Sequence, residues 1–140
     1  MISLETARQL KEAGLNWVPI MNDCFAIPGR GMDDRRFIIS DILVTVEILG
    51  GMEVVSFQGA SEWALDYLLT TEAVWLPSEE QLRQTLEHYL QDMGYAGYRL
   101  SHDQTEDQYE VTIDGGRLSF VASGASNAYA SALFYCLTGK

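Results

Sequence analysis

Carboxylates are the most abundant reactive side chains in this sequence of 140 residues, where 20 Asp and Glu stand against nine Lys and Arg. Paired acids can hold Ca²⁺ or Mg²⁺, or act as general acid and base. In the middle third an aromatic ring lies between two acids and could line a pocket or a partner surface, although a Trp that closes the core explains the pattern as well. The candidate ligand or partner surface comprises Asp33, Asp34, Asp41, Glu62, Trp63 and Asp66.

Local patterns around these acids assign no reaction to them. Asp33-Asp34-Arg35-Arg36 is charge-balanced and lies in a Gly-rich loop, so we expect local ion pairing there. The spacing of acids in a calcium-binding EF-hand loop is absent. We therefore predict no metal site, and a carboxylate enzyme using a divalent ion near Asp33, Asp41 and Asp66 remains one alternative.

The histidines and cysteines form no motif for catalysis or zinc binding. His88 and His102 are 14 residues apart with no nearby Cys, and both are expected to face solvent, His102 at the end of a strand in a segment whose composition indicates an exposed turn. Cys24 and Cys136 have apolar neighbours and indicate buried, reduced thiols, while a bridge between them, or a Cys24 nucleophile beside His102, stays open. Phosphate-loop and nucleophile-elbow patterns are absent too. The sequence thus predicts no catalytic residue and no cofactor.

Charge and composition exclude further classes of partner. A formal net charge of −11 repels nucleic acid and anionic lipid surfaces, so neither is an expected partner. The N-terminal residues lack a basic region followed by an apolar run, and no apolar stretch reaches the roughly 20 residues that cross a bilayer. We expect a cytoplasmic protein, in which 47% hydrophobic residues suffice for one domain spanning residues 1–140.

Helix signals lie at three places. Ser78 and Gln81 form a capping box, Pro77 and Leu82 a hydrophobic staple, and Gly94 the end of that helix. Its expected buried stripe is Leu82, Leu86, Tyr89, Leu90 and Met93. Ser3 caps a first helix that Gly14 ends. Ser123 is expected to cap a last helix, whose stripe is Ala125, Ala128 or Tyr129, Ala132 and Cys136.

Strand signals come mainly as hairpins. A period of two begins at Phe37, and a turn at Gly50-Gly51 would pair Leu49 with Met52, Val46 with Val55 and Val44 with Phe57. A second unit spans 98–102, 109–113 and 117–122, with Val111 facing Phe120 and Ile113 facing Leu118. Residues 24–27 before Pro28 indicate an edge strand. Residues 59–71 are ambiguous and favour a strand followed by a turn.

These patterns predict the α+β class: a single domain with an antiparallel sheet built from β-hairpins and about three helices. Strand order is left open.

Several blocks resemble a family. They are Ile27–Asp34, Phe37–Asp41, Phe57–Asp66 and Glu72–Pro77. As a set they are similar to an uncharacterised group of small bacterial proteins that often carry the label pilus assembly protein of the CpaE type, and the resemblance covers about residues 1 to 93. A CpaE-type protein implies a nucleotide-binding ATPase-like domain, but this sequence has neither its phosphate loop nor its length. The resemblance therefore implies a bacterial origin and no activity.

The function that these observations favour is binding of a protein. We expect a non-catalytic, acidic domain that binds a protein partner or itself as a homodimer. An alternative is an immunity or inhibitor protein that binds a basic toxin, because the net charge would steer it toward such a partner.

Overall fold

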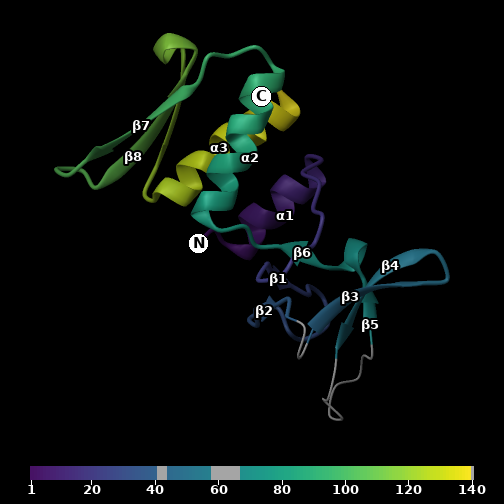
Figure 1. The fold of residues 1–140 in the computed structure, drawn as a ribbon. Helices are drawn as coiled ribbons and strands as arrows, with labels where there is room; N and C mark the ends of the chain where they lie inside the picture. Colours follow the sequence, from purple (N-terminus) through teal and green to yellow (C-terminus); the bar gives the residue numbers. More distant parts are fainter. Residues whose placement is uncertain (41–43, 58–66, 140) are drawn as a thin grey trace. The chain divides into compact units, whose positions relative to one another are not determined.

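The computed structural model describes residues 1–40, 44–57 and 67–139. This part of the chain has the α+β architecture predicted from the sequence, with three α-helices and antiparallel sheets built largely from hairpins (Figure 1). The helices are α1 (Leu4–Glu12), α2 (Glu79–Asp92) and α3 (Ala125–Thr138). The strands are β1 (Cys24–Ala26), β2 (Phe37–Ile38), β3 (Val44–Leu49), β4 (Met52–Phe57), β5 (Tyr67–Leu69), β6 (Val74–Trp75), β7 (Tyr98–Asp103), β8 (Gln108–Ile113) and β9 (Leu118–Ala122).

The chain divides into two compact units, which we describe separately. Unit 1 comprises Met1–Leu15 and Pro77–Lys140, and unit 2 comprises Asn16–Leu76. The first helix thus belongs with the C-terminal part of the chain, where α1 packs on α3. That the chain forms a single domain stays a prediction.

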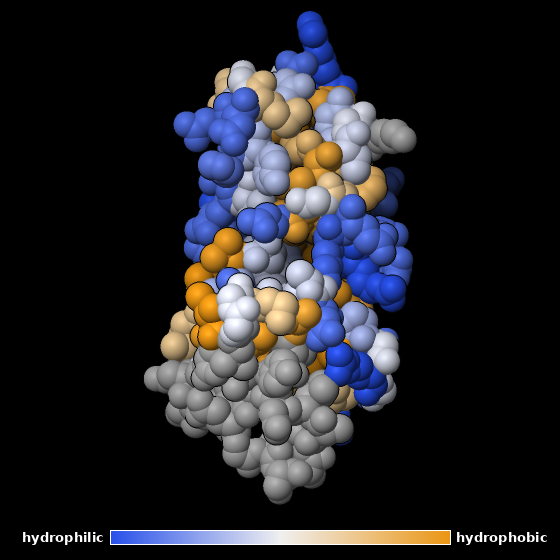
Figure 2. All heavy atoms as spheres, turned by 90° about the vertical axis from the view of Figure 1, so that its right-hand side faces the viewer, coloured by the Kyte–Doolittle hydropathy of each residue, from blue (hydrophilic) through white to orange (hydrophobic). Residues whose placement is uncertain are grey.

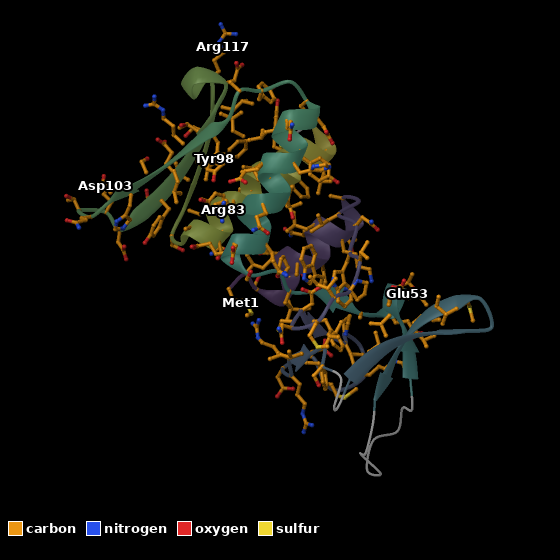
Figure 3. All side chains as sticks on the ribbon, viewed as in Figure 1. Met1, Glu53, Arg83, Tyr98, Asp103 and Arg117 are labelled. Carbon is orange, nitrogen blue, oxygen red and sulfur yellow. The ribbon has the colours of Figure 1, made fainter. Side chains whose placement is uncertain are left out.

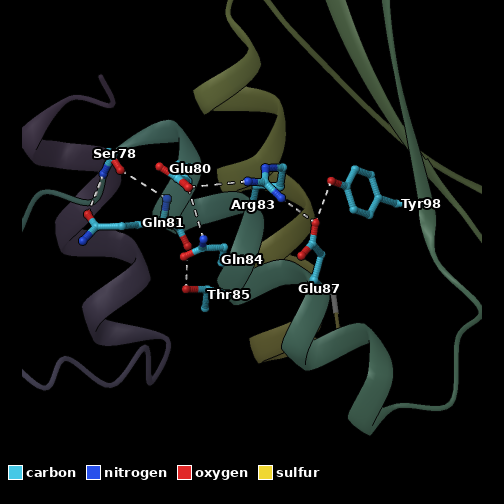
Figure 4. A network of polar contacts seen from close by, with 8 residues as sticks. All are labelled: Ser78, Glu80, Gln81, Arg83, Gln84, Thr85, Glu87 and Tyr98. Carbon is cyan, nitrogen blue, oxygen red and sulfur yellow. Dashed lines mark hydrogen bonds and ion pairs between the residues drawn. The ribbon is translucent and has the colours of Figure 1, made fainter.

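Both predicted caps at the start of α1 and α2 are confirmed. Ser3 Oγ accepts a hydrogen bond from the Thr6 amide at 3.1 Å. Before α2, Ser78 Oγ accepts from the Gln81 amide at 3.2 Å, and Gln81 Oε1 accepts from the Ser78 amide at 3.0 Å (Figure 4). These side chains satisfy amides that the first helical turn leaves without partners. Met93, predicted to be buried, is instead exposed, because it is the C-cap of α2 and lies beyond its last buried turn.

The last helix begins one residue later than predicted. Its N-cap is Gly124, which has no side chain to cap the helix, and Ser123 lies one position too early to do so. Small residues let this helix pack closely on several sides, and it contacts α1, α2, β8 and β9. The residues it buries include Ala125, Ala128, Tyr129, Ala132 and Leu133, whereas Cys136 is only half-buried.

Unit 1 contains a sheet with strand order β7-β8-β9. Its register confirms the predicted pairs Val111 with Phe120 and Ile113 with Leu118. Because α3 contacts β8 and β9, one face of this sheet packs on the helices. Along each strand, residues that face the helices alternate with residues of the opposite face. Val111 and Ile113 are among the buried residues of this sheet.

Unit 2 contains two sheets, with orders β2-β1-β6 and β3-β4-β5. The hairpin β3–β4 has the predicted register throughout, with Leu49 opposite Met52 and Val44 opposite Phe57. The period-two pattern from Phe37 onward is nonetheless divided, since β2 and β3 belong to different sheets. Tyr67–Leu69 forms a strand and Thr70–Glu72 a 3₁₀ turn, as predicted for the end of the ambiguous segment, whereas 58–66 lie outside the described residues.

The prediction that residues 24–27 form an edge strand is wrong. β1 is the central strand of its sheet and pairs with β2 on one side and β6 on the other. Pro28 lies beyond the end of β1, so its lack of an amide N–H interrupts no hydrogen bond of the strand. Phe25, fully buried in the centre, packs between the rings of Trp17 and Phe37 at centroid distances of 5.8 and 5.5 Å.

Candidate functional site

Two of the six predicted surface residues lie within the described part of the chain. Asp33 Oδ1 accepts a hydrogen bond from the Gly29 amide at 3.0 Å and so closes its own loop, and Asp34 is exposed. The same loop is joined to the 3₁₀ turn by an ion pair between Arg30 Nη2 and Glu72 Oε1 at 3.2 Å. Asp41, Glu62, Trp63 and Asp66 lie outside the described residues, so this surface stays a prediction.

The histidines lie on regular elements and pair with single acids. His88, on α2, is exposed, and its Nε2 lies 3.4 Å from Asp92 Oδ2. His102 lies near the end of β7, as the predicted strand 98–102 has it, and not in a loop; its ring stacks on Tyr109 at 4.3 Å, and its Nε2 lies 3.1 Å from Asp107 Oδ1. Over the ranges that the structure describes, no three His, Cys, Asp or Glu are grouped to hold a metal ion.

The two cysteines are half-buried free thiols. Burial raises the pKa of both, which favours the thiol over the reactive thiolate. Cys24 lies in unit 2, whereas Cys136 and His102 lie in unit 1. The local surroundings therefore do not activate either cysteine.

A polar network on α2 joins this helix to the sheet of unit 1 (Figure 4). Arg83 Nη1 donates to Glu87 Oε1 at 2.9 Å, and the hydroxyl of Tyr98 donates to the same oxygen at 3.1 Å. Burial, followed by the neighbouring hydroxyl of Tyr129, raises the pKa of Tyr98, so its proton is held more firmly than usual. The Glu87 carboxylate thus ties β7 to α2.

An open groove of about 560 Å³ lies between α1, α3 and β9. Polar lining residues such as Thr6, Gln9 and Asn127 alternate with apolar ones such as Phe120 and Phe134. None of its lining residues carries an ionisable side chain, so the groove has no group for proton transfer.

A buried carboxylate organises the loop that enters β1. Asp23 is only 2% exposed, and its Oδ2 accepts from Trp17 Nε1 at 2.9 Å and from the Ile20 amide at 3.1 Å. The Asp23 amide donates to the Ile20 carbonyl at 3.1 Å and closes a turn in which Asn22 has φ +72°, a left-handed conformation that Asn tolerates. The side chain and backbone of one residue thus hold the whole turn.

The same loop is tied to the segment that follows β2. The Asn22 amide donates to the Ile39 carbonyl, and the Ile39 amide donates to the Asp23 carbonyl, both at 2.9 Å. Ile38 pairs with Cys24 in the sheet, so it lies beside this turn. Two backbone hydrogen bonds thus tie the C-terminal end of the turn to Ile39.

Four large aliphatic residues of this region point into solvent. Val18 is 68% exposed, Ile20 60%, Met21 51% and Ile38 57%. We call this set, Val18, Ile20, Met21 and Ile38, the apolar loop surface. Contiguous exposed apolar residues are typical of protein contacts, whereas single exposed ones are common.

Other exposed aliphatic residues of the described chain are more scattered. Ile48 and Met52 flank the hairpin turn, but Ile48 lies opposite Glu53 and Met52 opposite Leu49, so they project from opposite faces of the hairpin. Figure 2 shows hydrophobic residues reaching the surface between hydrophilic ones on one face of the molecule. The apolar loop surface differs because three of its members lie in the segment that Asp23 closes, and Ile38 pairs with Cys24 directly after that segment.

The sequence interpretation missed this surface and the buried Asp23. The signal was a stretch of apolar residues interrupted by Gly14, Pro19, Asn22 and Asp23. These four are residue types that are common in turns and uncommon inside helices and strands. Apolar side chains in a segment with loop composition are candidates for exposure.

Comparison of the chain with protein-family models, with curated proteins and with solved structures finds no match. Among the described residues, no helix is long and apolar enough to cross a membrane.

Proposed function

We propose that this protein is a non-catalytic, acidic protein-binding domain and that the apolar loop surface contacts its partner. The observation that carries the proposal is the buried carboxylate of Asp23, which holds an exposed apolar loop in one conformation. A loop that is already ordered loses little conformational entropy on binding, so more of its contact energy contributes to affinity.

The size of the surface suits the centre of an interface. Full burial of a Val, Ile or Met side chain contributes about 1.5–3 kcal/mol, and these four residues are each half or more exposed. Together they could contribute several kcal/mol, against an association cost of roughly 4–15 kcal/mol. A partner must therefore also contact polar residues around the apolar loop surface.

The net charge indicates the kind of partner. A charge of −11 accelerates association with a basic protein and repels nucleic acid and anionic membranes. The inhibitor of a basic toxin is thus a special case of the proposed function.

The free thiols support a location in a reducing compartment, and we propose that the protein is cytoplasmic. Bacterial origin rests on the sequence resemblance alone.

Quantitative affinity capture from the source cell tests the proposal. Ile20→Ser and Met21→Ser together should remove a protein that the unmodified chain retains. Val121→Ser and Met93→Ser together form the matched control, because these residues are also exposed aliphatics but lie in unit 1. A captured protein that both double variants retain equally would contradict the role of the loop.

The competing enzyme hypothesis requires a divalent ion at the predicted acids. Calorimetric titration with Mg²⁺, Ca²⁺ and Mn²⁺ addresses it, with Asp66→Asn as the variant. Heat of binding that this substitution abolishes would favour the carboxylate enzyme over the binding domain, and the proposal predicts no such heat.

A further inference from the structure

The strand β7 has features of an edge that another strand can join. It lies at one side of the sheet β7-β8-β9, and every residue from Arg99 to Asp103 is exposed. Its pairing with β8 runs without a bulge from Tyr98 opposite Ile113 to Asp103 opposite Gln108. It contains neither Pro nor Lys. Bulges, prolines and lysines are the usual means by which proteins protect an edge strand from pairing.

The sequence of β7 is complementary to itself. Arg99, Ser101 and Asp103 alternate along the strand, so they project from the same face. In an antiparallel pair of two β7 strands centred on Ser101, this residue lies opposite its own copy. Arg99 then lies opposite Asp103 of the second copy, and the symmetry makes that pair twice.

Both charged groups are available for such a pair. Arg99 makes no ion pair with the described residues. Asp103 lies at the tip of the hairpin β7–β8 (Figure 3), where its Oδ1 accepts from the Thr105 amide at 2.8 Å. This bond fixes the carboxylate and leaves its other oxygen for a cation.

The opposite face of β7 also gains from this register. Leu100 is 39% exposed and would lie opposite His102 of the second copy, whose ring already stacks on Tyr109. Pairing would shield Leu100 from water and place an apolar contact on each side of the symmetry axis. Other registers lose these contacts. In a parallel pair in register, Arg99 would face Arg99 of the second copy and Asp103 would face Asp103. An antiparallel pair centred on Arg99 or on Asp103 would likewise place that residue opposite its own copy.

We propose that β7 pairs with β7 of a second copy of this chain, antiparallel and centred on Ser101, to form a continuous six-stranded sheet. This dimer goes beyond the proposed function, because it uses unit 1 and makes no use of the apolar loop surface in unit 2. The two proposals can therefore fail independently.

Sedimentation equilibrium of the full chain and of charge variants tests the register. Arg99→Glu alone and Asp103→Lys alone each place like charges opposite each other twice, so each should weaken self-association at least about tenfold. An equimolar mixture of the two variants should restore dimers, because both heterologous pairs then carry opposite charges. Arg117→Glu is the matched control: it makes the same charge change as Arg99→Glu just before β9, the outer strand on the other side of the sheet from β7 (Figure 3), and should leave the dimer intact.

A cross-linking measurement gives a second, independent test. Ser101→Cys should form an intermolecular disulfide on air oxidation, because the two residues lie opposite each other. Ser119→Cys, an exposed serine on the other edge strand β9, should not. A chain that sediments as a monomer at millimolar concentration would overturn the dimer. Equal dimerisation of Arg99→Glu and Arg117→Glu, or equal cross-linking at 101 and 119, would overturn the register.

Discussion

The indole Nε1 of Trp17 donates a hydrogen bond of 2.9 Å to the carboxylate of Asp23, which is almost completely buried. The same oxygen also accepts the amide of Ile20, a member of the apolar loop surface. Trp17 in turn stacks on Trp75 with a centroid distance of 6.5 Å and an interplanar angle of 6°. The group that shapes the proposed contact region is therefore also part of the packing of unit 2, and the two properties should respond together to mutation.

Asp23→Ala should lower the free energy of unfolding of unit 2 by about 2–4 kcal/mol, because it removes a buried carboxylate and leaves two partly buried donors without their acceptor. Urea denaturation followed by tryptophan fluorescence measures the loss. Asp34→Ala removes the same group from an exposed position and should change the stability by less than about 0.5 kcal/mol. Equal losses in the two variants would show that the buried carboxylate has no special role.

The two stacked tryptophans should differ in their response to replacement by Phe. Trp17→Phe loses a hydrogen bond to a charged group. Trp75→Phe loses none, since its buried Nε1 has no hydrogen-bond partner within the described residues. We expect Trp75→Phe to cost at least about 1 kcal/mol less than Trp17→Phe in denaturant unfolding followed by circular dichroism. The reverse order would contradict the assigned hydrogen bonds.

Ser78→Ala should destabilise α2 by about 1 kcal/mol, because it removes the oxygen that caps the Gln81 amide. Thermal and urea unfolding of the two proteins measure this difference. Ser131→Ala makes the same change at an exposed position inside α3, where Ala favours the helix, and should be neutral or slightly stabilising. A neutral Ser78→Ala would mean that the capping box contributes little.

Stability should fall as the pH rises above about 10. An unfolded Tyr releases its proton near pH 10, whereas burial raises the pKa of Tyr98 in the folded protein. The folded state then binds more protons than the unfolded state, so the contribution of this residue is complete below pH 10 and is lost above it. Urea unfolding between pH 8 and 11 should show a shallower alkaline decline for Tyr98→Phe. Parallel declines would assign the effect to other residues.

Local patterns predicted the elements whose partners lie nearby in the chain. The Gly50-Gly51 turn and the period-two alternation determine one register, and the structure has it from Leu49 opposite Met52 to Val44 opposite Phe57. Ser78 and Gln81 are three residues apart, so their capping box needs no distant residue. Such interactions can be derived from the sequence because all participants lie within a few residues.

Distant partners could not be derived in the same way. The central place of β1 depends on β6, about 50 residues further along the chain, and Pro28 gave a misleading local signal for an edge. Residue type also misplaced the start of α3: Ser123 is the better capping residue, yet the N-cap is Gly124. The apolar loop surface was missed because its exposure depends on Asp23 turning inward, which no pattern of residue types shows.

Photo-cross-linking at the apolar loop surface can capture the proposed protein partner covalently. A benzophenone amino acid at position 21, where Met21 is exposed on the apolar loop surface, should form a discrete covalent adduct with one protein in the source cell. The same amino acid in place of Met93, an exposed Met of unit 1, should not form this adduct. We expect an adduct at position 21 that Ile20→Ser weakens. Identical adduct patterns at positions 21 and 93, or no protein adduct at position 21, would contradict it.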